Sequence, residues 1–316
     1  MKAIVVRAFG GPEVLRLEAW PDPVAGPGQV VVDLAAVGVN PVETYIRAGS
    51  YANLPSLPYV PGTDGAGTVR AVGAGVTRLR VGDRVYVHAE RGAYAQAVAV
   101  PEARAWPLPA SVDFPQGAAI GVPFLTAHRA LFHVGRARPG EWCLVHGSSG
   151  GVGVAAVQMA VAFGLRVLAT ASSEGGRARA VADGAEAAFG HGDAEAIAAA
   201  TGGAGVDLIV EMAAHQSLAA DLALLAPGGR VVVVGSRAPI EINPRALMQT
   251  EGAVRGVMLH RATAAELGAS HRAIVAGLRA GALRPAVDRT WPLADAKAAH
   301  EGVLQGGRVG KVVLLP

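Results

Sequence analysis

The chain has 316 residues, more than the roughly 250–300 residues that one hydrophobic core usually supports, so we predict two domains. Hydrophobic residues make up 51% of the chain, but Gly, Arg or Pro interrupts every apolar run before it reaches the ~18 residues of a membrane span. The 28 Lys and Arg residues stand against 25 Asp and Glu residues and form no run of three, so neither membrane insertion nor a nucleic-acid-binding face is expected.

The N-terminus and the cysteine content bear on location. The first residues, MKAIVVRAFG, are apolar only briefly and lack a small-residue cleavage site, so they predict a first strand rather than a signal peptide. Cys143 is the only cysteine, which makes an intrachain disulfide impossible. A cytoplasmic location is therefore the default expectation.

The first ~115 residues predict a compact β-rich domain resembling a barrel. Turn sequences rich in Gly and Pro separate short β-type runs at 2–9, 29–39, 65–73, 83–89 and 93–100. Between the second and third of these runs, NPVETYIRAG predicts one helix. Asn40 is its expected N-cap, Glu43 closes a capping box, and Gly49 stops the helix.

From Trp142 onward, strands and helices alternate. The predicted strands are 142–146, 166–170, 186–190, 206–212, 230–235 and 253–259. The predicted helices between them are 152–164, 176–185, 193–202 and 217–229. Helices alternating with buried Val-rich strands predict a parallel, doubly wound sheet, and hence an α/β fold. The tail adds helices at 263–281 and 295–305 and a strand at 311–315. A cleft between the two units is the default ligand site.

The stretch HGSSGGVG (146–153) joins a predicted strand to a helix. Its apolar flanks argue against a flexible linker, but a tight turn without a ligand remains open. In a phosphate cradle, Gly150, Gly151 and Gly153 would let backbone N–H groups approach a pyrophosphate, and Ser149 would donate its hydroxyl. The stretch also contains G-x-S-x-G, the pattern of a serine-hydrolase nucleophile elbow. The additional glycines and the absence of a later Asp or His in a triad context favour the phosphate role.

The end of the next strand bears on which dinucleotide would bind. Sites for NAD usually carry Asp or Glu there, about 20 residues after the glycines. Here RVLAT is followed by Ala171, Ser172 and Ser173, with Glu174 only beyond them and then Arg177 and Arg179. Hydroxyl groups and an arginine suit the 2′-phosphate of NADP, which a carboxylate would repel. For either arginine alone, a solvated helix face remains the alternative.

Metal catalysis is not expected. One cysteine cannot build a Cys site, and the nine histidines are dispersed along the chain. His128 and His133 are five positions apart, which would place them on different faces of a helix. A nicotinamide cofactor needs neither a metal nor a protein nucleophile, because the cofactor carries the hydride.

Several stretches together carry a resemblance to a known family. They are GVNPVETYIRAGSY, LPYVPGTDGAGTV, VGDRVY, QGAAIGVPFLTAHRAL, LVHGSSGGVG and VVVVGSRAPIEINPR. Over essentially its whole length the chain resembles the zinc-free quinone oxidoreductases of the medium-chain dehydrogenase/reductase superfamily, most closely the zeta-crystallin type. This resemblance implies a GroES-like catalytic domain (1–118 and 260–316) around an inserted Rossmann domain (119–259). It also implies NADP(H) in the cleft between them and a homodimer or homotetramer.

The resemblance also concerns zinc. Zinc-dependent relatives carry a cysteine ligand where this chain has Asn40, and a Gly-His-Glu sequence where it has Gly62, Thr63 and Asp64. The cysteine-rich structural zinc lobe of those relatives is also missing. The resemblance and the residue composition therefore both predict that no metal is bound.

The resemblance implies specific site residues. Tyr45, Tyr51 and Asn40 are expected near the nicotinamide and the acceptor, with aromatic packing as the alternative for the tyrosines and helix capping for Asn40. Cofactor contacts are implied for Thr126, Ser149, Gly150, Gly151, Val152, Ser172, Ser173, Arg177, His191, Ser217, Val234, Gly235, Ser236, Arg237, Val257, Met258 and Leu259.

These cofactor contacts divide by the part of the dinucleotide they would touch. Residues 149–152 would hold the pyrophosphate, and Ser172, Ser173 and Arg177 the adenosine ribose phosphate. His191 would lie on the adenine side, although a surface-loop histidine is the alternative. The segments 234–237 and 257–259 would line the nicotinamide pocket. Thr126 would lie by the cofactor or serve as a buried helix hydroxyl, and Ser217 departs from the asparagine of close relatives.

The resulting expectation is an NADPH-dependent reductase of quinones or related electron-poor enones. A hydride would move from nicotinamide C4 to the acceptor, and a proton would arrive from solvent or from Tyr51. No strong buried acid/base pair is visible, so proximity and orientation should carry the chemistry. Two alternatives remain: reduction of the C=C bond of enals or enoyl thioesters, and binding of AU-rich RNA, which some zeta-crystallin relatives do.

Overall fold

The computed structural model describes residues 1–316 and contains two large sheets and one small hairpin. The seven-stranded sheet has the order β14-β15-β3-β4-β5-β7, with β6 paired to β3. Its strands are β3 (Gln29–Val39), β4 (Asp64–Val72), β5 (Arg84–His88), β6 (Ala97–Pro101), β7 (Ala105–Pro107), β14 (Val287–Pro292) and β15 (Lys311–Leu315). The hairpin pairs β1 (Lys2–Val5) with β2 (Arg16–Ala19). The C-terminal β15 pairs antiparallel with β3, so the tail completes the N-terminal sheet.

The second sheet is six-stranded and parallel, in the order β10-β9-β8-β11-β12-β13. Its strands are β8 (Trp142–Val145), β9 (Arg166–Thr170), β10 (Ala187–Phe189), β11 (Val206–Glu211), β12 (Leu225–Val233) and β13 (Ala253–Gly256). Its helices are α4 (Gly151–Ala162), α5 (Glu174–Ala182), α6 (Ala194–Ala200), α7 (Ala214–Leu224) and α8 (Pro244–Thr250). The chain order reverses between β8 and β11, which is where open α/β sheets bind ligands. The predicted α/β fold with a doubly wound sheet is confirmed.

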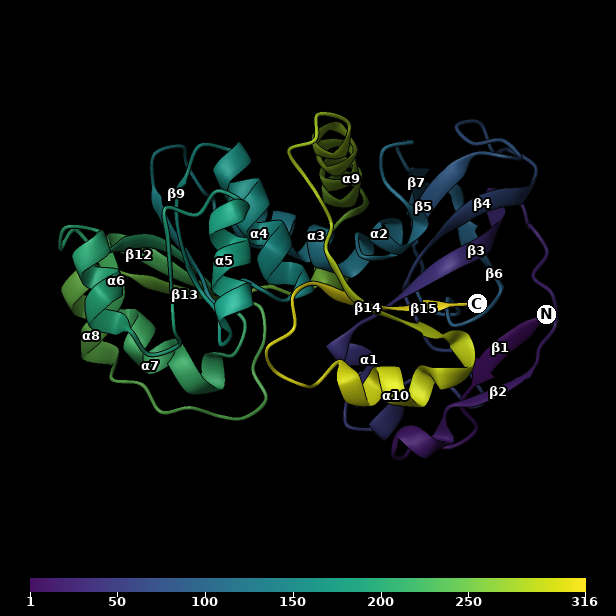
Figure 1. Cartoon of the computed structure of the whole chain (residues 1–316), viewed down its shortest axis with the longest axis horizontal. Coiled ribbons are helices and arrows are strands. Elements are labelled where there is room, and N and C mark those ends of the chain that lie inside the picture. The colour runs from purple at the N-terminus through teal and green to yellow at the C-terminus, as the bar shows by residue number, and fades with distance from the viewer.

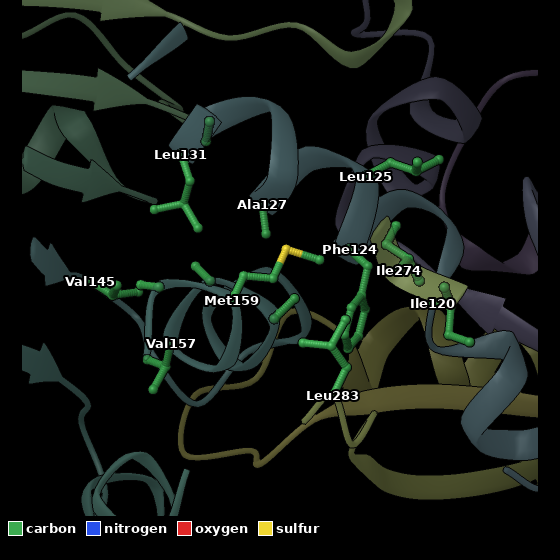
Figure 2. Packing of buried hydrophobic residues seen from close by; sticks show 14 of the residues in the cluster. Ile120, Phe124, Leu125, Ala127, Leu131, Val145, Val157, Met159, Ile274 and Leu283 are labelled. Carbon is green, nitrogen blue, oxygen red and sulfur yellow. The ribbon is translucent and has the colours of Figure 1, made fainter. Parts of the chain in front are cut away.

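Helices between the two sheets share one hydrophobic core (Figure 1). They are α2 (Phe114–Ala118), α3 (Gly121–His128) and α9 (Ala264–Arg279), while α1 (Pro41–Ala48) and α10 (Ala296–Gly302) pack elsewhere on the first sheet's domain. Figure 2 shows Phe124 of α3, Met159 of α4 and Ile274 of α9 converging in this cluster. Because the same apolar cluster continues from one sheet to the other, the two units are packed firmly together.

The helix at residues 41–48 forms as the sequence predicts. The Asn40 backbone N–H donates to Glu43 Oε2 at 2.9 Å, which is the capping-box contact from N3 back to the N-cap. Gly49 then ends the helix at φ 76°, a left-handed conformation that glycine adopts without strain. The local signals in this segment were therefore sufficient to define the helix.

Two predicted boundaries are wrong. The helix predicted at 217–229 is α7, which begins earlier and ends at Leu224. Leu225 is extended and pairs with Val206 of β11, so burial in the sheet overrides the helical propensity of this apolar run. The strand predicted at 253–259 ends at Gly256, where its parallel pairing with β12 stops.

The placement of His128 and His133 on different helix faces is also wrong. After α3 the chain continues as a π-helical turn, Arg129–Val134, in which the Gly135 N–H donates to the Ala130 carbonyl five residues earlier. This wider turn brings residues five apart onto one face. The two imidazole rings consequently lie 5.4 Å apart between their centroids.

Both chain termini lie at the end of the molecule formed by the first domain, on the right in Figure 1. None of the helices combines the length and the apolar character needed to cross a membrane.

Candidate active site

The glycine loop at residues 146–153, which we call the cradle, presents backbone N–H groups at the N-terminus of α4. The N–H groups of Val152 and Gly153 have no acceptor in the protein and no side chain caps this helix end, while an isolated parallel bridge pairs Gly150 with Gly310. The Ser148 hydroxyl donates to the Thr170 carbonyl at 3.0 Å, whereas the Ser149 hydroxyl makes no hydrogen bond to the protein. A helix N-terminus with free donors is a suitable site for a pyrophosphate.

The glycines of the loop have different roles. A Cβ on Gly153 would lie 2.2 Å from the Gly147 carbonyl oxygen, so this glycine permits close packing of helix against strand. Gly147 itself has φ 59°. Gly150 and Gly151 have more room, because a Cβ added to them would meet its nearest neighbour only at 3.6 Å and 3.2 Å. The predicted close-approach role therefore fits Gly150 and Gly151, and Gly153 is better described as a packing position.

At the end of β9, the structure brings Ser172, Ser173 and Arg177 together. Ser173 is the N-cap of α5, and its hydroxyl oxygen accepts the Gly176 N–H at 3.1 Å. Arg177 Nη1 donates to the Ala171 carbonyl at 3.2 Å, which holds the guanidinium at the strand end. Arg179 instead pairs with Asp183 at 2.7 Å, so only one of the two arginines faces this end of the strand.

A segment of the tail reaches the cradle, and sequence reasoning did not single it out. The Gly310 N–H donates to the Ser149 carbonyl at 2.7 Å, and the Ser173 hydroxyl donates to the Gly307 carbonyl at 3.3 Å. The glycines at 306, 307 and 310 were the only local signal for a close approach. The loop that leads into β15 thus contacts both the predicted pyrophosphate loop and the predicted ribose-phosphate site.

The predicted nicotinamide-side residues follow the ends of β12 and β13. The Val234 N–H donates to the Glu211 carbonyl at 2.8 Å, and the Ser236 hydroxyl is occupied by the Ala238 carbonyl at 2.9 Å. Arg237 is exposed, and its backbone N–H donates to His215 Nδ1. After β13, Val257 is buried while Met258 is exposed.

The remaining predicted residues have hydroxyl groups without protein partners. Thr126 lies on α3, is 8% exposed, and makes no side-chain hydrogen bond. Ser217 lies within α7, and its hydroxyl is likewise without a partner. Tyr45 of α1 and Tyr51 just beyond it are half-buried, and neither hydroxyl is hydrogen-bonded to the protein. These groups are free to meet a ligand.

Asn40 lies in a buried polar network. Its Nδ2 donates to Asp64 Oδ2 at 2.9 Å and to Thr63 Oγ1 at 3.2 Å, and Lys311 Nζ donates to its Oδ1. Lys311 Nζ also lies 2.9 Å from Asp64 Oδ2, and both side chains are almost fully buried, at 4% and 0% exposure. All polar atoms of the Asn40 side chain are therefore engaged, and we assign this residue to positioning rather than to contact with the nicotinamide.

Electrostatics stabilise this network. Burial alone would raise the pKa of Asp64, but the Lys311 charge, His88 and Asn40 outweigh it and lower that pKa to about 2. The expectation that no strong buried acid and base would be found is wrong. Asp64 is held as a carboxylate against a buried ammonium, and the pairing joins residues 247 positions apart.

A second buried cluster lies beneath the cradle and was not predicted. His146 Nε2 is 2.9 Å from Asp221 Oδ1, and its Nδ1 is 2.9 Å from Thr170 Oγ1. The same Thr170 oxygen is 3.0 Å from His191 Nδ1. Glu211 lies on the other side, with Oε2 3.7 Å from His146 Nε2. The histidines that are dispersed in the sequence are thus brought together in space.

Comparisons with known proteins agree with this arrangement. Residues 26–110 match the family described as alcohol dehydrogenase GroES-like domain, and residues 180–314 match the family described as zinc-binding dehydrogenase. The chain is 46% identical to the quinone oxidoreductase of Rattus norvegicus over 321 residues, which covers 100% of this chain and 98% of that protein. The corresponding identity to the Homo sapiens quinone oxidoreductase is 44%, with the same coverage.

The chain belongs to the quinone oxidoreductase family of the medium-chain dehydrogenase/reductase superfamily. Among solved structures, the quinone oxidoreductase of Thermus thermophilus, which was also solved as a complex with NADPH, is 38% identical with a TM-score of 0.88. An NAD-dependent alcohol dehydrogenase is 32% identical with a TM-score of 0.93. In both cases 100% of both chains is covered.

Family membership makes this protein an oxidoreductase enzyme with a nicotinamide cofactor and a small-molecule substrate. The cradle fits such a cofactor, because the free N–H groups of α4 and the Ser149 hydroxyl are the donors that a pyrophosphate needs. The overall likeness does not separate NADPH from NAD, since both cofactors occur in the names of similar structures.

The zinc implied by the second family description does not fit these residues. In zinc-dependent relatives of this quinone oxidoreductase, ligands stand at the positions of Asn40 and Thr63. Here an amide and a hydroxyl occupy them, and the Lys311 ammonium binds the adjacent Asp64 carboxylate. An ammonium ion at this position would repel a divalent cation.

Proposed function

We propose that this quinone oxidoreductase uses NADPH, works without zinc, and transfers a hydride to quinones or related electron-poor enones. The observation that carries the cofactor assignment is the end of β9, where Ser172 and Ser173 are followed by Arg177 and no acid stands at the tip. The Arg177 guanidinium and the Ser172 hydroxyl suit a 2′-phosphate, whereas a carboxylate would repel it, and the Ser173 hydroxyl is engaged by Gly307 and Gly176.

When bound, NADPH supplies the hydride through C4 of its nicotinamide. The residues of the chain bind and orient this cofactor. The N-terminus of α4 binds its pyrophosphate, and the strand ends at Val234 and Val257 border its nicotinamide. A quinone that takes up one hydride and one proton becomes a hydroquinone. The proton comes from solvent or from Tyr51, whose hydroxyl has no competing protein partner.

The proposed acceptor pocket is bordered by the segment after α1. Tyr51 is followed by Leu54 and Leu57, which are 43% and 39% exposed. Exposed apolar side chains beside free tyrosine hydroxyls suit a flat, apolar acceptor with polar oxygens, such as a quinone. The same side chains would also admit an enone. Quinones and enones therefore have to be distinguished by their rates of NADPH oxidation.

Zinc independence is supported by the Lys311–Asp64 pair and by Asn40, which place a cation, its counter-ion and a neutral amide at the position of a metal. No Lewis acid is needed for hydride transfer to a quinone, because the acceptor is already electron-poor. Positioning of cofactor and acceptor is then the main contribution of the protein.

A homo-oligomer is proposed to form through β13. This strand is the outer edge of the parallel sheet and pairs only with β12. Val254 on the strand and the nearby Met248 and Met258 are exposed, at 36%, 75% and 47%. An uncovered strand edge with apolar neighbours is suited to pair with a second copy of itself. Light scattering after size-exclusion chromatography should give the mass of a dimer or tetramer.

The proposed activity is tested by stopped-flow absorbance of NADPH oxidation with a panel of quinones, enones and enoyl thioesters. We expect quinones to give the highest kcat/KM, NADPH to outperform NADH, and dialysis against a chelator to leave the rate unchanged. Faster turnover of enones than of every quinone would assign the enzyme to C=C reduction. Absence of NADPH oxidation with all acceptors would refute the proposal.

A further inference from the structure

A continuous hydrogen-bonded chain crosses the carboxyl ends of three neighbouring strands beneath the cradle. Asp221 of α7 contacts His146, which follows β8, and His146 contacts Thr170, the last residue of β9. Thr170 then contacts His191, which follows β10. Asp221, His146 and Thr170 are buried, whereas His191 is exposed. The chain therefore connects a buried carboxylate to the surface.

The exposed end of this chain lies beside the adenosine phosphate site of the proposed function. β9 and β10 are adjacent and parallel, with Thr170 opposite Phe189, so the residues that follow them emerge at the same edge. Arg177, which holds the Ala171 carbonyl, belongs to this edge. His191 binds Thr170 through Nδ1, and its Nε2 makes no hydrogen bond to the protein. This nitrogen is available to a ligand at the adenosine end.

The single hydroxyl hydrogen of Thr170 determines the direction of the chain. Its oxygen lies between two imidazole nitrogens, so it donates to one and accepts from the other. If His146 carries hydrogens on both nitrogens, Thr170 accepts from His146 and donates to Nδ1 of His191. A neutral His191 then carries its hydrogen on Nε2. If His146 is neutral, the directions reverse, and Nε2 of His191 becomes a bare acceptor.

The buried end favours the protonated form of His146. Desolvation lowers the pKa of His146, but its hydrogen bond to Asp221 and the charges of Asp221 and Glu211 outweigh this and raise the pKa overall. His191 has a lowered pKa, through desolvation and the nearby His146 charge, and so stays neutral. Burial, with a further contribution from Asp221, raises the pKa of Glu211 to about 7.

A proton on Glu211, rather than a metal ion, accounts for the charges of this cluster. Ligand-type atoms of His146, Glu211 and Asp221 lie within 4.8 Å of one another. However, His146 Nε2 already donates to Asp221, and a buried oxygen on each acid lacks a donor. A proton on Glu211 supplies a donor and leaves a net charge of zero with protonated His146 and the Asp221 carboxylate.

We propose that protonated His146, acting through Thr170, holds His191 in the tautomer with hydrogen on Nε2, and that this outward N–H donates to the adenosine 2′-phosphate of NADPH. A phosphate accepts hydrogen bonds and would be repelled by a bare imidazole nitrogen. His146 and Thr170 are therefore positioning residues for cofactor choice. The inference rests on the proposed use of NADPH.

The test compares Thr170→Val, which keeps the shape and removes the hydroxyl, with Thr170→Ser, which keeps the hydroxyl. Dissociation constants for NADPH and NADH are measured by fluorescence titration at neutral pH. Thr170→Val should weaken NADPH binding about fivefold to tenfold and NADH binding less than twofold. Thr170→Ser should retain the wild-type preference. With wild type, NADPH affinity should fall as the pH rises above neutral, and Thr170→Val should flatten this dependence.

A second variant and a spectroscopic readout keep the test decisive if Thr170→Val does not fold. The double variant Asp221→Asn, Glu211→Gln removes both carboxylates that favour protonated His146 and should likewise weaken NADPH selectively. In 15N-histidine spectra, His191 should carry its hydrogen on Nε2 in wild type and on Nδ1 in the double variant Asp221→Asn, Glu211→Gln. Equal weakening of NADPH and NADH, or unchanged NADPH affinity, would overturn the relay. Failure of wild type itself to bind NADPH would instead overturn the proposed function.

Discussion

Replacing Lys311 with methionine should destabilise the protein more than a surface change of the same size. Lys311 is 4% exposed and Asp64 is fully buried, with Nζ and Oδ2 2.9 Å apart. The substitution leaves the Asp64 carboxylate buried without its cation, while Met fills most of the lysine volume. Removal of one partner from such a buried pair costs about 3–5 kcal/mol of unfolding free energy.

The pH dependence gives a sharper form of this prediction. In the wild type the pKa of Asp64 is lowered to about 2, so its contribution of about 2 kcal/mol is present above pH ~4 and is lost as the pH falls toward 2. In Lys311→Met, burial raises that pKa instead. The stability difference between wild type and variant should therefore shrink as the pH is lowered from 7 toward about 4, where Asp64 becomes neutral in the variant.

Urea unfolding followed by tryptophan fluorescence at several pH values provides the measurement. The double variant Lys311→Met, Asp64→Asn is the matched control, because it removes the orphaned charge and should recover part of the lost stability. A loss below about 1 kcal/mol at pH 7, or a loss that is independent of pH, would show that the pair is exposed to water and that the reasoning is wrong.

Three further predictions concern the cofactor and the acceptor. Gly153→Ala should abolish NADPH binding measured by titration, because its Cβ would lie 2.2 Å from the Gly147 backbone oxygen and must displace the cradle. Arg177→Ala should raise the Kd for NADPH about tenfold and leave that for NADH within twofold, and equal effects on both would exclude a 2′-phosphate contact. Tyr51→Phe should lower kcat severalfold with unchanged NADPH affinity if Tyr51 supplies the proton, and unchanged kcat would assign that step to solvent.

Features defined by local sequence were predictable. The cap at Asn40 and the stop at Gly49 rest on contacts within one turn, and the alternation of strands and helices from Trp142 onward reflects hydrophobic periodicity. The position of the Gly-rich loop between a strand and a helix was also predictable, whereas its role in binding phosphate stays a prediction. Errors arose where packing competed with propensity, as at Leu225, which is helical by composition but pairs in the sheet.

Features defined by distant partners were not predictable from a single sequence. Lys311 donates to Asn40 across 271 positions, and His146 contacts Asp221 across 75. Neither Lys311 nor His146 stands at a sequence spacing from its partner that distinguishes it from an ordinary surface lysine or loop histidine. Burial of these charges follows only from the pairing of β15 with β3 and of β8 with β11.

The tail joins the two halves of the site through consecutive residues. Gly310 holds the Ser149 carbonyl of the cradle, and the next residue, Lys311, holds Asp64 and Asn40 of the first domain. Gly310 has φ 103°, and a Cβ there would lie 2.5 Å from the Ala286 carbonyl oxygen, so no other residue fits. Because Gly310 is covalently joined to Lys311, the first residue of β15, the cradle is tied to the Asp64 network. A hydride donor bound in the cradle would thereby be held at a defined position relative to the proposed acceptor pocket beside α1, which is what a reaction driven by proximity requires.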